Sequence, residues 1–591
     1  MRKHAGERLL FGGTILASAF LLFQIEPIIA KAILPWFGGT AAVWTVCLLF
    51  FQVGLLAGYL YAYGSVRCLG RRVQAAVHLG LLGLSLWVLP VVPPESWKPG
   101  GGENPLLRIV GLLAVTLGLP YVLLSTTSPL AQAWYERRGQ GSPYRLYALS
   151  NLGSLAALMS YPFLVEPALA TSRQERWWSW GYAGFVILCG GAVLCAVGPA
   201  KASESGAPQD DAPTPGWRQQ LLWVALTACA STLLLAVTEH LCKNVAPIPF
   251  LWVLPLALYL LSFILCFEGR GWYRRAWYWR LLPAAFVGIS FGLSKYGAVA
   301  GLRLSILIFA AGLFVCCMFC HGELAAQKPH ASRLTSFYLM CALGGALGGV
   351  FVGVVAPYAF HGPYELRIGL ACCMFLPAVL ALQEGRRRAG WLAAGLAAVL
   401  LAHLGFEVRN ARGGAKVMER NFYGVLRVSE ADGVRTLMHG VVNHGEQFLD
   451  TARRRQPTTY YGPQSGIGLA LLRSGRPERQ RVGVIGLGAG VLAAYGREGD
   501  TYRFYEINPL AVDIARRQFY FLQDCPAQVD VVVGDGRLLL EREPDQKFDV
   551  LAVDAFSGDA IPMHLLTEQA LTLYFRHLRP GGVLALHLSN R

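Results

Sequence analysis

The chain has 591 residues, of which 54% are hydrophobic and 15% are charged. This balance is too apolar for a soluble protein of this size and indicates a membrane protein. The formal net charge of +16 fits basic cytoplasmic loops beside anionic lipid. Nucleic acid is not expected as a partner, because the sequence has no basic-aromatic stripe and no known nucleic-acid-binding module.

Apolar segments dominate the first part of the chain. Residues 1–8 are basic, and the apolar run that follows is too long for a cleaved signal peptide, so we expect a retained first span. The first six predicted spans cover residues 9–34, 41–63, 75–92, 106–128, 143–165 and 177–198. After a polar linker, the next six cover residues 219–242, 250–267, 281–296, 302–320, 334–357 and 365–383.

The two sets of spans resemble each other in sequence. The stretch 147–153 is similar to 338–344. Other matched pairs are Ser18 and Ser231, Glu26 and Glu239, Lys31 and Lys243, and Trp44 and Trp252. These matches predict two parallel repeats of six helices, the pattern of the major facilitator superfamily.

Charged residues at membrane depth are costly and are often functional. Glu26 precedes Pro27, and Glu239 occupies the matched position of the second repeat. A helix interrupted there in both repeats would form a central site for a cationic solute or a proton, with Lys31 and Lys243 nearby. The alternative is that each glutamate pairs locally with the lysine that follows it.

Lysine and arginine residues predict the orientation. The basic clusters lie on one side of the membrane, which the positive-inside rule makes cytoplasmic together with the N-terminus. They are Arg67/Arg71/Arg72, Arg137/Arg138, Arg270/Arg274/Arg275 and Arg386/Arg387/Arg388. A further apolar run, 391–406, leaves undecided on which side of the membrane the C-terminal domain lies. If this run is a thirteenth span, the domain lies outside the cytoplasm. A nucleotide-type substrate favours the cytoplasmic side instead.

The 14 cysteines lie mainly in apolar segments and do not form a disulfide framework. Residues 317–321 fit the C-x-x-C-H pattern of haem attachment, but they end an even-numbered span on the cytoplasmic side. We therefore favour helix packing for these cysteines, and we expect no metal.

Short β-type runs alternate with helical segments near the C-terminus, as in a parallel α/β sheet. The first run, 482–485, leads into a loop that contains Gly486, Gly488 and Gly490. Glycines at this place let the backbone turn sharply and approach a ligand. A single loop of this kind is weak evidence for a cofactor site.

Acidic residues then follow the next three predicted strands. Glu506 ends the second strand, Asp535 with Gly536 follows the third, and Asp554 follows the fourth. The carboxyl ends of parallel strands meet at one edge, where open α/β sheets bind ligands. As a series, these residues predict a nucleoside site, although each acid alone could be a helix cap or a solvated loop residue.

The order of these motifs resembles the spermidine synthase family, and more closely its membrane-fused bacterial branch. The resemblance covers roughly residues 410–591. It includes 421–425 and 435–443, which look like the small β-domain that precedes the nucleotide fold in that family. It implies a Rossmann-like domain of the class I methyltransferase type in a bacterial inner membrane protein.

The resemblance also implies roles for individual residues. Glu506 would hold the ribose of decarboxylated S-adenosylmethionine, Asp535 would hold the adenine, and Asp554 would open the catalytic loop. Tyr461 falls near the substrate-site tyrosine of the family, and Asn443 stands where the family has glutamine.

Two positions depart from the family pattern. The acid that grips the ammonium group of the aminopropyl chain is replaced by Ala489. The second acid of the catalytic loop is replaced by Ser557, and an acid appears only at Asp559, which we keep as a catalytic candidate. A cationic amine needs carboxylates to compensate its lost hydration, so the polyamine half of the site is less well kept than the nucleoside half.

The predicted function is transfer of an aminopropyl or related group from a nucleoside derived from S-adenosylmethionine to an amine. Two alternatives remain open: a transporter with a non-catalytic nucleoside-binding domain, and a methyltransferase that uses S-adenosylmethionine. Lipid, a nucleoside and an amine are the expected partners, and a homodimer is left open.

The predicted domains follow from these segments. They are a first repeat (1–200), a linker (201–217), a second repeat with a possible extra span (218–406), a small β-domain (412–475) and the nucleotide-binding domain (476–591). Only five strands are evident in the last domain, the fifth being 583–588. An apolar strand at an open edge would aggregate, so we expect that another chain or the membrane part covers it, or that the sequence stops short of the natural one.

Overall fold

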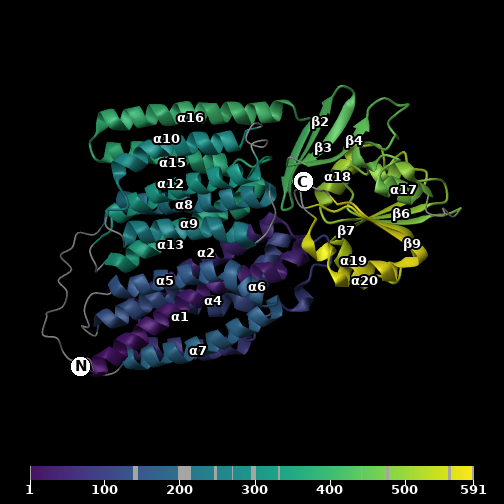
Figure 1. Cartoon of the computed structure of the whole chain (residues 1–591). Coiled ribbons are helices and arrows are strands. Elements are labelled where there is room, and N and C mark those ends of the chain that lie inside the picture. Colours follow the sequence, from purple (N-terminus) through teal and green to yellow (C-terminus); the bar gives the residue numbers. More distant parts are fainter. Residues whose placement is uncertain are drawn as a thin grey trace.

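A computed structural model describes residues 2–137, 144–197, 215–244, 249–268, 271–294, 301–329, 333–440, 442–473, 478–556 and 561–588. Long helices form a bundle, and a part made of strands and shorter helices is docked against one end of it (Figure 1). The N-terminus lies at the opposite end of the bundle (Figure 1).

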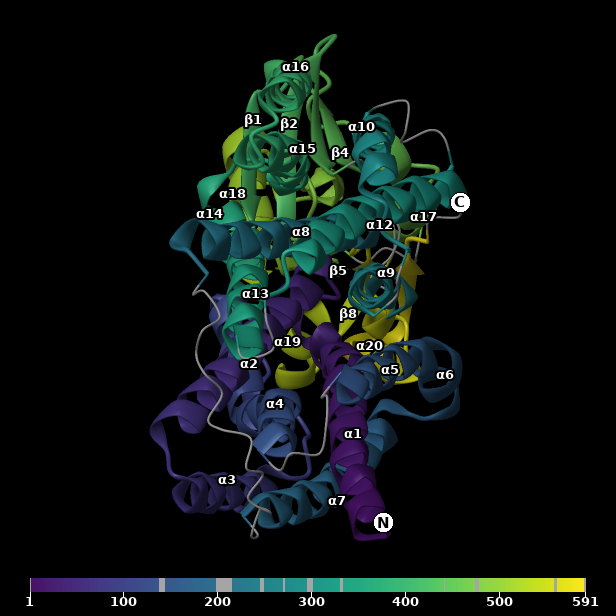
Figure 2. The same ribbon diagram turned by 90° about the vertical axis from the view of Figure 1, so that its left-hand side faces the viewer.

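The first half of the bundle contains the helices that precede the linker. They are α1 (Arg2–Ile33), α2 (Ala41–Cys68), α3 (Arg71–Ser85), α4 (Pro105–Arg137), α5 (Tyr144–Ser160), the short α6 (Glu166–Ala168) and α7 (Thr171–Val197). Seen along the bundle, this half is packed beside the second half, with α2 and α13 at their junction (Figure 2).

The second half repeats the arrangement and adds one helix. Its helices are α8 (Trp217–Asn244), α9 (Pro249–Phe267), α10 (Arg275–Gly292), α12 (Leu302–Ala326), α13 (Leu334–Val350), the short α14 (Ala356–Ala359), α15 (Glu365–Gln383) and α16 (Arg387–Gly413). Each predicted span therefore corresponds to a helix.

Ten helices of the described residues are long and apolar enough to cross a membrane, and the protein is therefore a multi-pass membrane protein. Helices α3, α5 and α10 are not among the ten. Helix α16 is among them, although only 17% of its apolar window is buried, and it runs the length of the bundle (Figure 1). The apolar run 391–406 is thus part of a helix long enough for a thirteenth span.

Matched positions of the two halves take matched structures. The rings of Trp44 and Trp252 stack on each other, with centroids 4.9 Å apart. Helices α5 and α13 each continue into a π-helical turn, Tyr161–Val165 and Phe351–Val355, followed by a short helix that contains a proline. Shared irregularities at shared positions agree with two structural repeats.

The helix is not interrupted after Glu26, contrary to the sequence prediction. Helix α1 continues through Pro27 to Ile33. Proline is tolerated within a membrane helix when neighbouring helices satisfy the freed backbone groups. In this turn of α1, the Tyr161 hydroxyl donates to the Pro27 carbonyl over 3.4 Å, which joins the helix to the π-helical turn after α5.

Four antiparallel strands form the small β-domain in the order β1-β2-β3-β4. They are β1 (Val417–Asn421), β2 (Gly424–Ala431), β3 (Val434–His439) and β4 (Val442–Phe448). Asp432 and Gly433 join β2 to β3 with φ values of 51° and 74°, a left-handed pair that suits a tight hairpin.

Five parallel strands form the second sheet in the order β7-β6-β5-β8-β9. The strands are β5 (Arg481–Ile485), β6 (Thr501–Glu506), β7 (Gln528–Val533), β8 (Phe548–Val553) and β9 (Leu578–Leu586). The accompanying helices are α17 (Gly466–Arg473), α18 (Pro509–Gln518), α19 (Gly536–Arg542) and α20 (Glu568–His577). The sheet reverses its order beside β5, which creates a crevice at the carboxyl ends of the strands.

The fifth strand starts earlier than the sequence predicted. Strand β9 pairs with β8 from Leu578 onward and includes Pro580. Its outer edge has no strand partner among the described residues, and an edge is the place where a strand tolerates proline. Whether another chain covers this edge stays a prediction.

The carboxyl edge of the parallel sheet faces the membrane bundle. A Cβ atom added to Gly38, in the loop between α1 and α2, would lie 2.5 Å from Cδ1 of Ile507. In the loop between α3 and α4, a Cβ atom added to Gly101 would lie 2.5 Å from the carbonyl oxygen of Val533, the last residue of β7. The bundle is therefore in contact with the edge where the sequence predicts the site.

Candidate functional site

The glycine loop after β5 is shaped by close backbone contacts. Gly486 has a φ of 100°, and a Cβ atom there would lie 2.2 Å from the Asp554 carbonyl oxygen. Gly488 has a φ of 55° and is similarly close to the His444 carbonyl oxygen, which accepts a hydrogen bond from the Ala489 N–H. Only glycine fits where the loop passes between β8 and the β-domain.

Glu506, the last residue of β6, is held by backbone donors. Its two carboxylate oxygens accept the N–H groups of Leu487 and Asn508 over 2.9 Å and 2.8 Å. Burial raises the pKa of Glu506, and these N–H donors act in the opposite direction. Each oxygen keeps a second lone pair, so the carboxylate can still accept ribose hydroxyls.

Asp535 combines a structural contact with its predicted place in the site. One carboxylate oxygen caps α19 by accepting the Leu538 N–H, and the other lies 2.9 Å from Nε2 of His564. Gly536, the first residue of α19, packs against Ile485. The helix-cap interpretation therefore applies to Asp535, and its role toward adenine stays a prediction.

Asp554 lies between two ring side chains. Its Oδ2 accepts the Tyr461 hydroxyl over 2.5 Å, and its Oδ1 lies 2.7 Å from Nδ1 of His587. Burial first, and then the charge of Asp554, raise the pKa of Tyr461 well above its usual value. Tyr461 is therefore a neutral donor that orients the carboxylate. Asp559 and Ser557 lie outside the described residues.

Asn443 makes its side-chain contacts within its own strand. Its amide donates to Glu446 over 2.7 Å, and its carbonyl oxygen Oδ1 accepts the Gly445 N–H. Its backbone carbonyl accepts the Tyr460 hydroxyl over 3.0 Å. Asn443 thus contacts Tyr460, next to Tyr461, and is not among the residues that line the cavity around Glu506 and Asp554.

One cavity of about 810 Å³ brings six of the predicted residues together. Gly490 packs against Leu522 and, like Tyr461, is not among the residues that line this cavity. Its lining residues from the nucleotide fold include Gly486, Gly488, Glu506, Asp535, Gly536 and Asp554. The β-domain adds Tyr423 and His444, and the membrane bundle adds Gly38 and Thr40. Parts of three structural units therefore enclose the space above the sheet edge.

The departure at Ala489 has a structural counterpart. Ala489 is fully buried, and a Cβ atom added to Gly445 would lie 2.8 Å from its methyl group. Position 489 thus carries a methyl group packed against β4, where the resemblance implies an acid.

The four predicted membrane residues do not form one site. Glu26 accepts the Tyr121 hydroxyl over 3.0 Å, and Lys31 pairs with Glu166 over 2.7 Å. Local pairing is thus wrong for the first repeat. Glu239 pairs with Lys243, as local pairing predicts, and its Oε1 also lies 3.5 Å from the Arg420 guanidinium of β1.

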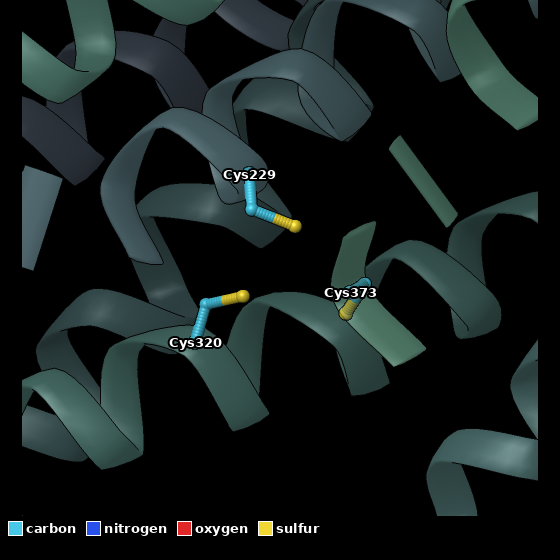
Figure 3. Close-up of side chains that lie close together, drawn as sticks. All are labelled: Cys229, Cys320 and Cys373. Carbon is cyan, nitrogen blue, oxygen red and sulfur yellow. The ribbon is translucent and has the colours of Figure 1, made fainter. Parts of the chain in front are cut away.

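Three buried cysteines lie closer together than the sequence indicated. Cys229, Cys320 and Cys373 come from α8, α12 and α15, and their sulfur atoms all lie within 4.8 Å of one another (Figure 3). His321, from the C-x-x-C-H pattern, is buried within α12 and bonds Ser262 over 2.9 Å. That histidine therefore belongs to the packing of α12.

Sequence reasoning missed the histidines of the site, which are His439, His444, His564 and His587. His587 directly follows β9, so the end-of-strand rule that selected the acids would also have selected it. His564 lies in the segment after the glycine- and serine-containing loop, where no pattern separates it from a surface residue. Its position beside Asp535 is a result of tertiary contact.

No family model matches the chain. The chain is 34% identical over 113 residues to the polyamine aminopropyltransferase of Vibrio vulnificus (strain CMCP6), which covers 18% of this chain and 37% of that protein. It is 31% identical over 112 residues to the probable polyamine aminopropyl transferase of Bifidobacterium longum (strain NCC 2705), which covers 18% of this chain and 23% of that protein. The similarity spans little more than a third of the curated relatives at most.

Solved transporters resemble the chain more broadly but weakly. The inward-open xylose transporter XylE from E. coli has a TM-score of 0.39 at 14% identity, covering 62% of this chain and 95% of that chain. Tetrameric PepTSo2 has a TM-score of 0.37 at 13% identity, covering 69% of this chain and 99% of that chain. These scores are too low to carry an argument about function.

Proposed function

We propose that this protein is an integral membrane transferase that moves an aminopropyl or related group from a nucleoside derived from S-adenosylmethionine to an amine. The observation that carries the proposal is the shared cavity in which Glu506, Asp535 and Asp554 meet the glycine loop. The similarity to curated aminopropyltransferases over 113 residues supports the same reaction class.

The residues present suit this group transfer. The amine nitrogen attacks the propyl carbon next to the sulfonium, the C–S bond breaks, and its electron pair stays on the sulfur of the departing thioether nucleoside. Asp554 takes the proton that the nitrogen loses, while Tyr461 and His587 hold its two oxygens in place. Glu506 accepts the ribose hydroxyls and fixes the nucleoside for in-line attack.

A second candidate is an S-adenosylmethionine-dependent methyltransferase. The methyl group at Ala489 motivates this candidate, because position 489 supplies no carboxylate for the ammonium of an aminopropyl group. Both candidates use the same nucleoside site, so the identity of the transferred group separates them.

The test uses the purified full-length protein in detergent micelles. Decarboxylated or intact S-adenosylmethionine is offered with short diamines, and the nucleoside products are identified by mass spectrometry. The proposal expects methylthioadenosine and an aminopropylated amine. Methyl transfer with S-adenosylhomocysteine as product would overturn it in favour of the second candidate, and binding without any turnover would favour the transporter with a non-catalytic domain.

Nucleoside binding is tested separately by calorimetry. Glu506→Ala should weaken the binding of an adenosyl ligand roughly tenfold or more, because it removes a charged acceptor for two hydroxyls. The matched control is Glu498→Ala, which removes an exposed glutamate that does not line the cavity. Equal affinity of wild type and Glu506→Ala would contradict the assignment.

A further inference from the structure

The part of the membrane bundle that lines the cavity is a tight turn between α1 and α2. Leu34–Phe37 forms a 3-10 turn, and Gly38 and Gly39 follow with φ values of 78° and 65°. Both values lie in the left-handed region that glycine adopts without strain. The glycine pair therefore reverses the chain and places Thr40 at the start of α2.

Thr40 occupies the N-cap position of α2 without capping the helix. Its backbone has the extended conformation of an N-cap, with φ of −84° and ψ of 151°, yet its hydroxyl accepts no N–H from the helix. Threonine is favoured at this position because that hydrogen bond stabilises a helix by about 1 kcal/mol. The Thr40 side chain therefore does not make the N-cap hydrogen bond that is usual at this position.

The Thr40 hydroxyl has no other hydrogen-bond partner among the described residues. Its oxygen is buried, and the residue is 8% exposed. Leaving a buried hydroxyl unpaired costs roughly 1–3 kcal/mol, so such groups normally find a partner. Thr40 lines the cavity that contains Glu506 and Asp554. A ligand in that cavity would supply the missing hydrogen bond.

The neighbours of the turn place Thr40 beside the reacting end of the site. Gly38 packs on Ile507, which follows Glu506, and a Cβ atom added to Gly39 would lie 3.2 Å from Pro562, in the segment that follows Asp554. The turn thus lies between the predicted ribose acid and the predicted catalytic loop.

A second unpaired group comes from the β-domain. His444 Nε2 is buried without a hydrogen-bond partner in the described part of the chain, and His444 belongs to the lining of the same cavity. Burial lowers the pKa of His444 to about 3, so its ring is neutral at physiological pH. The cavity therefore contains two unpaired polar groups that do not belong to the nucleotide fold.

The cavity continues past Thr40 into the space between the domains. A neighbouring cavity of about 1250 Å³ shares Thr40, Tyr423 and His439 with it and reaches Glu239 and Lys243 of the bundle. Thr40 lies where the two cavities meet. A ligand at the sheet edge would therefore touch the bundle at this residue.

We propose that the membrane bundle completes the nucleoside site and that the Thr40 hydroxyl is a ligand-binding group for an adenosyl ligand. The proposal rests on the proposed function for the existence of that ligand. It adds that the site is shared: the nucleotide fold supplies the acids, and the bundle supplies a polar group from its first loop.

The experiment measures the binding of methylthioadenosine and S-adenosylmethionine to the full-length protein by calorimetry. Thr40→Val is nearly isosteric and removes only the hydroxyl, and Thr40→Ser keeps it. We expect Thr40→Val to weaken binding roughly three- to tenfold and Thr40→Ser to retain wild-type affinity, as for the loss of one hydrogen bond. Thr40→Val should not lower the thermal midpoint, because the hydroxyl has no protein partner to lose.

Thr116→Val is the matched control. Thr116 also carries a buried hydroxyl without a partner, but it lies in α4 and does not line either cavity. The Thr116→Val variant should bind both ligands with wild-type affinity. Equal loss in Thr40→Val and Thr116→Val, or no loss in either, would overturn the proposal.

Glu506→Ala separates this proposal from the proposed function. If Glu506→Ala weakens binding and Thr40→Val does not, the nucleoside site stands and the contribution of the bundle is refuted. If the wild type binds neither adenosyl ligand, the proposed function is overturned, and this proposal with it.

Discussion

Asp554 is the residue on which the proposed chemistry depends most directly. Its two oxygens are occupied by Tyr461 and His587, so its orientation is fixed before any substrate binds. Tyr460 and Phe556 lie beside the His587 ring, with centroid distances of 4.4 Å and 5.1 Å. An acid surrounded by rings suits a group that approaches as a cation and leaves a proton behind.

Asp554→Asn should abolish turnover while leaving nucleoside affinity within about twofold of wild type. The amide has the same shape, but it cannot take a proton, so the effect falls on kcat. Single-turnover assays with calorimetry on the same preparation would check this. A variant that loses binding and turnover equally would show that Asp554 holds the nucleoside instead.

Two histidines of the β-domain link stability to pH. Burial lowers the pKa of His439 to about 4, with the charge of Lys243 acting in the same direction. Burial also lowers the pKa of His444 to about 3. The unfolded chain binds protons on these residues below about pH 6.5, whereas the folded chain does not. The free energy of unfolding should therefore fall as the pH drops from 6.5 toward 4, and should not depend on these residues above that range.

His444→Gln should flatten this dependence. The expected loss of slope is roughly 1 kcal/mol per pH unit near pH 5, read from thermal midpoints of the solubilised protein at pH 7.5 and pH 5.0. The exposed His361, replaced by glutamine, is the control and should leave the slope unchanged. An identical slope in wild type and His444→Gln would refute the linkage.

At the scale of the elements, β1 is attached to the bundle by a buried arginine. Arg420 makes two hydrogen bonds to Glu365, at the start of α15, over 2.8 Å and 3.1 Å. Its side chain is 2% exposed, and it also approaches Glu239 of α8. One arginine thus joins the β-domain to two helices of the second repeat.

Arg420→Met should destabilise the protein by about 3–5 kcal/mol, because it leaves a buried carboxylate without its partner. Arg420→Met combined with Glu365→Met should recover much of this loss. Arg517→Ala is the control: Arg517 lies in α18 and pairs with Glu419 of β1, and the two side chains are 46% and 37% exposed, so its removal should cost much less than Arg420→Met. Chemical denaturation of the solubilised variants measures all three, and equal effects of Arg420→Met and Arg517→Ala would contradict the interpretation.

At the scale of the whole molecule, the direction of α16 bears on which side of the membrane the C-terminal domain lies. The N-terminus and the nucleotide fold lie at opposite ends of the bundle (Figure 1). Arg71, Arg275 and Arg387, which begin α3, α10 and α16, belong to the basic clusters at the N-terminal end. The positive-inside rule therefore makes that end cytoplasmic and predicts a nucleotide fold on the opposite side.

Cysteine labelling in intact cells tests this topology. With a membrane-impermeant maleimide, Asp545→Cys on the nucleotide fold should gain label over the wild type, and Arg71→Cys should not. Both positions are exposed in the structure. The reverse pattern would place the nucleotide fold in the cytoplasm. If the prediction is confirmed, the nucleoside must be supplied outside the cytoplasm or pass through the membrane part.

The sequence by itself determined the elements, because their signals are local. Long apolar runs predict helices wherever they occur, and each predicted span is found in a helix. Glycines and acids that directly follow β-type runs predicted the glycine loop, Glu506 and Asp554 at one sheet edge. The same local logic failed at Pro27, where neighbouring helices decide whether the helix continues, and at the start of β9, where Arg579 to Gly582 resemble a turn.

Only the tertiary structure decided how the parts meet. Arg420 bonds Glu365 across 55 residues of sequence, and Tyr461 reaches Asp554 across 93. The turn that contains Thr40 lies against residues of a domain that begins hundreds of positions later. No local pattern carries such pairings, because they depend on the packing of whole elements. The acids could be predicted because each follows a strand in sequence. The residues opposite them come from the first loop of the membrane bundle, and only the tertiary structure shows this.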